Sequence, residues 1–279
     1  MDLSHTTELE VPWNRAMEAP FTRLLLHDGD VNGKVRFHNL DIWHCVHLGV
    51  GKSWIAGGAM ELQKLIPESN VDKRLATMSR CYKEFCKREH LTPVIGKIDA
   101  FTFGGPGKER NGAWNKACVT SNLMLFMEDF CRQHAEQIQD DKALRVFVPA
   151  YGTQQLNRFM RGLYEGDVFI PSATARCLCA SLYSWLRAYC FLAHDSFEKG
   201  VAAYPMLPKL HAVHEIGHLM RHQATLSNFV VNPAVHSCSV DEDMVGRCAC
   251  ISRGVSPQKI PQRTLERYLC HIQILWARA

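Results

Sequence analysis

The stretch that decides the fold runs from Pro171 to Lys199 and reads PSATARCLCASLYSWLRAYCFLAHDSFEK. Pro171 and Ser172 open a pattern in which apolar residues recur at helical spacing. Its most apolar part, residues 177–193, contains Arg187 together with Ser, Tyr and Trp residues. It therefore lacks the ~20 uninterrupted apolar residues that a membrane span needs. The pattern predicts a long helix buried in the core.

Helical patterns also fill most of the chain on both sides of this stretch. Asn70 is predicted to cap an amphipathic helix that ends near Arg88. Further helices are predicted over residues 41–65, 113–138, 146–164, 209–223 and 239–251, and from Pro261 onward. Strand candidates are scarce, and residues 35–40 are one of them. The sequence predicts a mainly α protein, an irregular bundle of about seven or eight helices with at most a few short strands.

Breaks in these patterns divide the chain into three segments. Residues 1–36 are predicted to be an irregular N-terminal segment, and residues 37–204 a helical domain. Residues 205–279 are predicted to be a C-terminal helical segment that packs on that domain. Pro205 and Pro208 mark the boundary, because proline interrupts a helical pattern.

Composition narrows the class of protein. The chain has 279 residues, of which 47% are hydrophobic, so it can bury a sizeable core. Residues 1–11 hold acidic side chains and no apolar run, unlike a secretory signal. We therefore expect an intracellular protein whose 12 cysteines stay reduced. Several of them lie in apolar helical patterns, where free cysteine behaves as a small buried hydrophobe: Cys81, Cys86, Cys118, Cys131 and Cys190.

The charge balance permits an anionic partner without requiring one. The formal net charge is +4, and no dense Lys/Arg run is present. DNA is thus a possible partner, and no membrane partner is expected. A basic stretch near the C-terminus suits either phosphate contacts or a solvated helix face: Arg247, Arg253, Lys259, Arg263 and Arg267.

The first cluster of residues that could bind a metal or take part in catalysis is Asp41-Ile42-Trp43-His44-Cys45-Val46-His47. Asp41, His44 and His47 are three residues apart, so a helix places them near one face. A carboxylate beside an imidazole can orient it or share a metal with it. Alternatively, Asp41 caps the helix and both histidines are satisfied by hydrogen bonds.

The next residues, Gly49-Val50-Gly51-Lys52-Ser53, end like a phosphate-binding loop. That motif needs a glycine where this chain has Val46, and it needs a buried strand before it. We therefore predict no nucleotide site here.

The second cluster is His214-Glu215-Ile216-Gly217-His218, which matches the HExxH zinc pattern. His214 and His218 would bind Zn²⁺, Glu215 would act as general base, and Glu242, or alternatively His222, would complete the ligand set. His211 and His222 extend the same stripe at helical spacing. The opposite face is the predicted core face: Leu210, Val213, Ile216 and Met220. The alternative is a solvated, histidine-rich helix face.

The third cluster follows Ser239, which is predicted to cap a helix with Asp241, Glu242 and Asp243 in its first turn. Carboxylates suit that position because they face the positive end of the helix dipole. The alternative is that Glu242 binds a divalent metal.

Three of these segments, taken in order, resemble the later part of DDE transposases with a ribonuclease-H-like core, of the CACTA and related types. They are Asp41 to His44, Pro208-Lys209-Leu210-His211, and the acidic helix that follows. The resemblance implies that Asp41 and His44 match a D-x-x-H element and that Glu242 is the terminal catalytic carboxylate. Asp41 and Glu242 would then be catalytic, and Mg²⁺ would be the cofactor.

The resemblance also implies a truncated or domesticated remnant. The strands that carry the first two catalytic aspartates have no room before Asp41, where only Asp28 or Asp30 could stand in. We therefore expect a transposon-derived protein that is nuclear and inactive alone in DNA strand transfer. The alternatives are a zinc-dependent hydrolase and a non-catalytic helical interaction protein, both expected in the cytoplasm.

Overall fold

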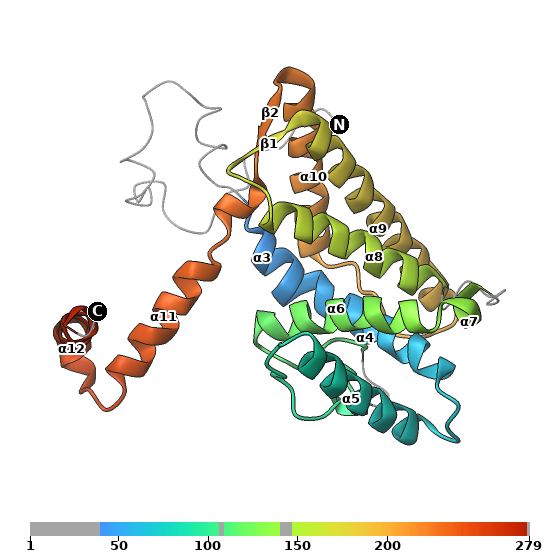
Figure 1. Ribbon diagram of the computed structural model, residues 1–279, viewed down its shortest axis with the longest axis horizontal. Helices are drawn as coiled ribbons and strands as arrows, with labels where there is room; N and C mark the ends of the chain where they lie inside the picture. The colour runs from blue at the N-terminus through green and yellow to red at the C-terminus, as the bar shows by residue number, and fades with distance from the viewer. Residues whose placement is uncertain (1–39, 106–108, 140–146, 278–279) are drawn as a thin grey trace, which may run out of the picture. The chain divides into compact units, whose positions relative to one another are not determined.

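A computed structural model describes residues 40–105, 109–139 and 147–277, with only the backbone at residues 147, 240–243 and 275. The prediction of a mainly α protein is confirmed within these residues (Figure 1). One small antiparallel sheet pairs β1 (Phe169–Pro171) with β2 (Phe229–Val231). The predicted irregular segment 1–36 lies outside the described residues, as does all but the last residue of the strand candidate 35–40.

The helices follow the predicted order. They are α3 (Ile42–Cys45), α4 (Gly51–Leu62), α5 (Val71–Arg88), α6 (Ala117–Gln133), α7 (Ala135–Gln139), α8 (Phe147–Tyr164), α9 (Ser172–Glu198), α10 (Pro208–Leu226), α11 (Ser239–Ser252) and α12 (Ile260–Trp276). Asn70 caps α5 as predicted, because its side chain accepts a hydrogen bond from the Lys73 amide at 2.9 Å. α10 packs on α9 and on α3.

One predicted helix start and one predicted helix cap are wrong. The helix expected from residue 113 begins only at Ala117 and breaks near His134, which separates α6 from α7. The Trp114 indole donates to Thr120 Oγ1 at 2.8 Å, so the residues before α6 fold back onto its first turn. Ser239 does not cap α11, because Cys238 occupies the cap position and Ser239 is the first helical residue.

A kink interrupts the run predicted as helical over residues 41–65. α3 passes into a π-helical turn, η2 (Val46–Val50), and α4 follows. The backbone at Gly49 is non-helical, with φ −130° and ψ −119°. A Cβ atom at this position would lie 2.6 Å from Cδ of Lys209. Glycine at position 49 therefore lets the start of α10 pack directly against the kink.

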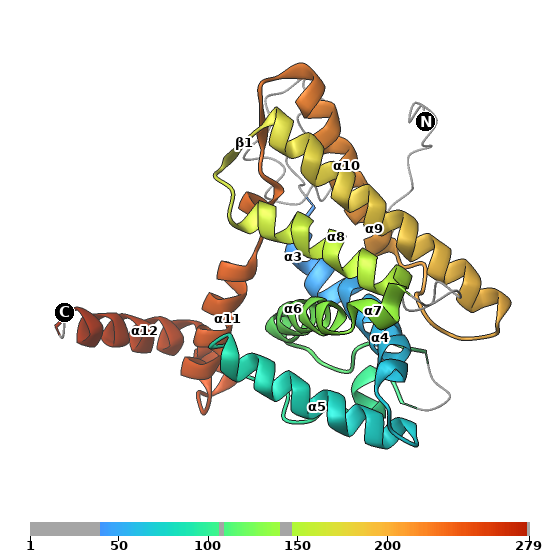
Figure 2. The same ribbon diagram turned by 45° about the vertical axis from the view of Figure 1, so that its right-hand side comes forward.

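The core is built around the long helix α9, which packs against both α8 and α10 (Figures 1 and 2). Four aromatic side chains lie at its centre, each at most 3% exposed: Trp54, Trp185, Tyr189 and Tyr204. The contacting rings have centroids 5.6–6.1 Å apart. The Trp54 indole also donates to Thr153 Oγ1 at 2.9 Å. The cluster thus joins α4, α8 and α9.

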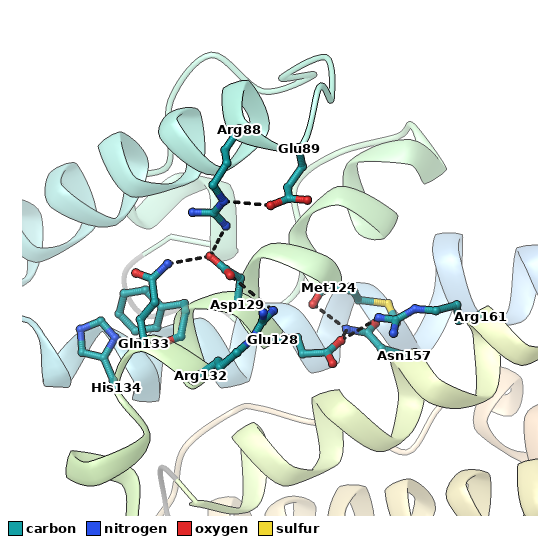
Figure 3. A network of polar contacts seen from close by, with 11 residues as sticks. Arg88, Glu89, Met124, Glu128, Asp129, Arg132, Gln133, His134, Asn157 and Arg161 are labelled. Atoms are coloured by element: carbon teal, nitrogen blue, oxygen red, sulfur yellow. Dashed lines mark hydrogen bonds and ion pairs between the residues drawn. The ribbon is translucent and has the colours of Figure 1, made fainter.

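A polar network holds α6 between α5 and α8 (Figure 3). Asp129 on α6 accepts hydrogen bonds from Arg88 on α5 at 2.7 Å and from Gln133 at 2.7 Å. The buried amide of Asn157 on α8 donates to Met124 O at 2.9 Å and to Glu128 at 2.7 Å. Because buried polar groups are costly without partners, these bonds define how the three helices meet.

All twelve cysteines are free, but their predicted burial is only partly right. Cys86 and Cys131 are buried and Cys81 is half-buried. Cys118 and Cys190 are exposed, because they lie on the solvent side of α6 and α9. Within the described residues, none of the helices combines the length and hydrophobicity needed to cross a bilayer.

Candidate metal centre

The candidate site is built on Asp41, whose two carboxylate oxygens make different contacts. Oδ1 accepts a hydrogen bond from the Trp43 amide at 2.8 Å and so caps α3. Oδ2 lies 2.6 Å from Nδ1 of His44. The cap and the carboxylate–imidazole pair, which the spacing offered as alternatives, are therefore both present.

Cys238 joins this pair from a distant part of the chain. Its thiol donates to Asp41 Oδ2 at 2.6 Å, and its sulfur lies 3.1 Å from His44 Nδ1. One ligand atom from each of the three residues lies within 4.8 Å of the others. Among the described residues, these three are the metal-ligating side chains that lie close enough together to hold one ion. Sequence reasoning missed Cys238; the available signal was His236 and Cys238, two ligand types directly before a predicted helix.

Asn232 positions Cys238. This residue is 2% exposed, and its Nδ2 donates to Leu163 O at 2.7 Å, Asp167 O at 3.0 Å and Gly166 O at 3.3 Å. Its Oδ1 caps the 3₁₀ turn η5 (Pro233–His236) by accepting from the Ala234 amide. One buried amide thus fastens the segment before Cys238 to the end of α8. η5 also packs against α3.

The local charges favour an ionised Asp41. Burial raises the pKa of its carboxyl, but hydrogen bonds from Cys238, His44 and the Trp43 amide, with the charge of His44, lower it further than burial raises it. The pKa of Asp41 is therefore below its ordinary value, and the group is a carboxylate at neutral pH.

The donor set fits zinc better than magnesium. Tetrahedral Zn²⁺ with sulfur, nitrogen and oxygen ligands separates them by about 3.3–3.6 Å, so each pair of atoms here would move apart by roughly 0.5–1 Å. Small side-chain rotations supply such a shift. A thiolate with an imidazole suits Zn²⁺, whereas Mg²⁺ selects oxygen ligands.

The same geometry argues against a nucleophilic triad. In a Cys–His–Asp relay, the nucleophile and the carboxylate contact opposite nitrogens of the ring. Here the sulfur of Cys238 and the carboxylate of Asp41 both meet Nδ1 of His44. Atoms that converge on one point are the arrangement expected for ligands of one ion.

His47, the third member of the predicted spacing, serves a different purpose. Its ring is 4% exposed, with Nε2 3.2 Å from Tyr164 Oη and Nδ1 3.3 Å from Ser121 Oγ. Burial lowers the pKa of His47 to about 4, and the nearby charge of Asp41 only partly opposes this. His47 is therefore a neutral core side chain that joins α6 and α8.

This burial predicts a pH-dependent stability. The unfolded chain binds a proton at His47 near the ordinary pKa of 6.5, and the folded chain only near 4. Between these values the unfolded state holds more protons, so the free energy of unfolding falls as the pH falls. We expect the contribution of His47 to the free energy of unfolding to drop by about 2 kcal/mol from pH ~7.5 to pH ~5. Urea unfolding of the wild type and of His47→Gln at both pH values measures it, and identical pH slopes in the two proteins would contradict the assignment.

The HExxH residues lie elsewhere. His214 and His218 are on the exposed face of α10, where His211 and His222 are also exposed. The predicted core face of this helix is buried as expected: Leu210, Val213, Ile216 and Met220. The His214 ring contacts the edge of Tyr183, with centroids 5.7 Å apart. Among the described residues, no third ligand joins His214 and His218 in a compact group.

Glu242 lies in the first part of α11, four residues beyond Cys238, and its side chain is outside the described residues. Farther along, Arg267 on α12 donates to the carbonyls of Ile251 and Arg253 at 2.9 and 3.3 Å. This arginine of the predicted basic stretch therefore fastens α12 to the end of α11.

Comparison with protein-family models, curated proteins and solved structures finds no match to this chain. Its function has to be argued from the geometry of the site.

Proposed function

We propose that this chain is a zinc-binding helical protein related to DDE transposases, with Asp41, His44 and Cys238 as the zinc ligands. The observation that carries the proposal is the contact of Cys238 with both Asp41 and His44. These residues are almost 200 positions apart in the chain, so only the fold brings a thiol, an imidazole and a carboxylate to one point.

The arrangement of the three family-like segments supports the relationship to transposases. The Asp41–His44 segment meets the residue directly before the acidic helix. The Pro208–His211 segment reaches the same region, because Lys209 Nζ donates to Leu48 O at 3.1 Å. Segments that resemble one protein family in order along the chain are thus also neighbours in space.

In this proposal zinc fastens the start of α3 to the start of α11. Asp41 supplies a charged oxygen, His44 a ring nitrogen and Cys238 a thiolate, which leaves a fourth position for water or another ligand. A catalytic Mg²⁺ would need further oxygen ligands, and Glu242 is the candidate that the resemblance implies. The chain alone is proposed to be inactive in DNA strand transfer.

Metal analysis of the purified full-length chain tests the proposal. We expect one equivalent of zinc in the wild type, and loss of stoichiometric zinc in His44→Ala and Cys238→Ser. Loss of groups that only orient a ligand costs 10–100-fold in affinity, so loss of a ligand itself should cost about 100-fold or more. Competition with a chromophoric chelator measures this change.

His218→Ala is the matched control, because it removes an exposed histidine from α10 and should leave the zinc content unchanged. Zinc that is lost in His214→Ala but kept in His44→Ala would overturn the proposal in favour of the zinc hydrolase. A wild-type chain without zinc affinity would overturn it in favour of a non-catalytic interaction protein.

A further inference from the structure

One side of helix α12 packs on its neighbour α11. Among the described residues, α12 has its extensive contacts with α11 and with the turn η6 (Pro257–Lys259). Arg267 donates to two carbonyls at the end of α11, and the Thr264 hydroxyl is buried. These two side chains lie within about 60° of each other around the helix, so they mark the side that faces α11.

A second apolar side of α12 faces solvent. It is a stripe of four residues that fall within about 60° around the helix, roughly 130° away from the α11 side: Leu265, Leu269, Ile272 and Trp276. Leu265, Leu269 and Trp276 are 58%, 56% and 80% exposed, and Ile272 is half-buried. A contiguous apolar patch of this kind marks an interaction surface. We refer to these four residues as the α12 stripe.

The spacing of the α12 stripe is the same in both directions along the helix. Its residues are separated by four, three and four positions. An antiparallel copy of the same helix therefore places an apolar side chain opposite an apolar side chain at every level. Leu265 meets Trp276 of the partner subunit, and Leu269 meets Ile272 of the partner subunit. This is the alternation of three and four that lets two helices interlock their side chains.

The charges of α12 also favour the antiparallel direction. Its charged residues, Arg263, Glu266 and Arg267, all lie in its first half, and residues 268–277 contain no Asp, Glu, Lys or Arg. Antiparallel pairing lays the charged half of one helix along the uncharged half of the other. Parallel pairing would instead set each arginine beside its own equivalent, and like charges repel.

We propose that the α12 stripe pairs with the α12 stripe of a second copy of this chain, antiparallel and about a two-fold axis. Such an interface is isologous and closes at the dimer, because each copy uses the same surface. The zinc centre plays no part in it.

The size of the stripe sets the strength of the pairing. α12 has 17 residues, so it is about 25 Å long. Four apolar side chains each bury roughly 60–120 Å², which gives a total for both copies at or below the lower end of stable interfaces. We expect a reversible dimer with a Kd of about 10–100 µM. At low micromolar concentration the chain is then monomeric, so the dimer does not contribute to unfolding measured there.

Sedimentation equilibrium of the full-length chain, at concentrations from about 5 to 300 µM, tests the proposal. The mass of the wild type should rise from that of the monomer towards twice that value. Leu269→Glu places a carboxylate in the middle of the stripe and should raise the Kd by at least about tenfold. Circular dichroism should be unchanged, because this side chain points away from α11.

Ile274→Glu is the matched control. Ile274 is 51% exposed on the same helix, but it lies on the opposite side from the stripe. The same change there should leave the Kd within about twofold of the wild type. An equal loss of dimer in both variants overturns the proposal, and so does full dimerisation of Leu269→Glu. A wild type that stays monomeric at the highest concentration also overturns it, in favour of a different protein partner for the stripe.

The direction of the pairing is tested by the double variant Leu269→Glu, Ile272→Lys. In the antiparallel register each new carboxylate faces a new ammonium group of the other copy, so the double variant should dimerise more tightly than Leu269→Glu alone. In a parallel register each new charge faces its own equivalent, and a double variant that dimerises no better than Leu269→Glu overturns the antiparallel arrangement. His44→Ala, which removes a proposed zinc ligand, should dimerise like the wild type, so the two proposals can fail separately.

Discussion

Replacing Trp54 by alanine is expected to lower the free energy of unfolding by about 3–5 kcal/mol. Trp54 is fully buried and contacts the rings of Trp185, Tyr189 and Tyr204. The truncation removes these contacts and leaves a large cavity where α4, α8 and α9 meet. It also removes the indole donor to Thr153 Oγ1. Since domains of this kind are stable by only about 5–15 kcal/mol, the loss is a large share of the total.

Urea unfolding followed by circular dichroism measures this loss. Trp276→Ala is the control, because the same truncation on α12 affects a side chain that is 80% exposed. Its effect should stay within about 0.5 kcal/mol of the wild type. A loss below about 1 kcal/mol for Trp54→Ala would show that the aromatic cluster is not the centre of the core.

Replacing Asn232 by leucine is expected to cost about 3–4 kcal/mol, because three carbonyls lose a donor and the Ala234 amide loses its acceptor. Leucine has the same branched shape and is larger, so no cavity forms, and the cost comes from unsatisfied polar groups and from fitting two methyl groups into the same space. The turn before Cys238 loses its attachment to α8. We therefore expect zinc affinity to fall by about 10–100-fold, although Asn232 is a positioning residue and not a ligand.

Unfolding and zinc competition on the same sample separate the two effects. Asn228→Leu changes an exposed asparagine four residues earlier, and it should alter neither stability nor zinc affinity by a measurable amount. If Asn232→Leu loses stability but keeps full zinc affinity, Asn232 does not position Cys238.

Much of the fold could be predicted from local patterns. The periodicity of residues 172–198 and the cap at Asn70 depend on neighbours within a few turns, and both appear as expected. The kink at Gly49 could not be predicted in this way, because its cause is the packing of Lys209 from a distant segment. The short β1–β2 ladder was missed for the same reason, since each strand has three residues and exists only through its partner.

The candidate site also combines features set by nearby residues with features set by distant ones. Three-residue spacing was enough to place Asp41 beside His44, since both lie in the first turn of one helix. HExxH spacing places His214 and His218 on one side of α10, and the tertiary structure leaves that side in solvent. Cys238 had no local signal strong enough to select it among twelve cysteines.

The sequence by itself therefore determined the helical class, most helix limits, the buried face of α10 and the Asp41–His44 pair, because each depends on residues within one or two helical turns. Only the tertiary structure decided that Cys238 meets that pair and that Lys209 meets the Leu48 carbonyl. These contacts join residues more than 150 positions apart. Side chains so distant are brought together by the packing of buried faces and by the Asn232 hydrogen bonds, and no short-range pattern encodes that outcome.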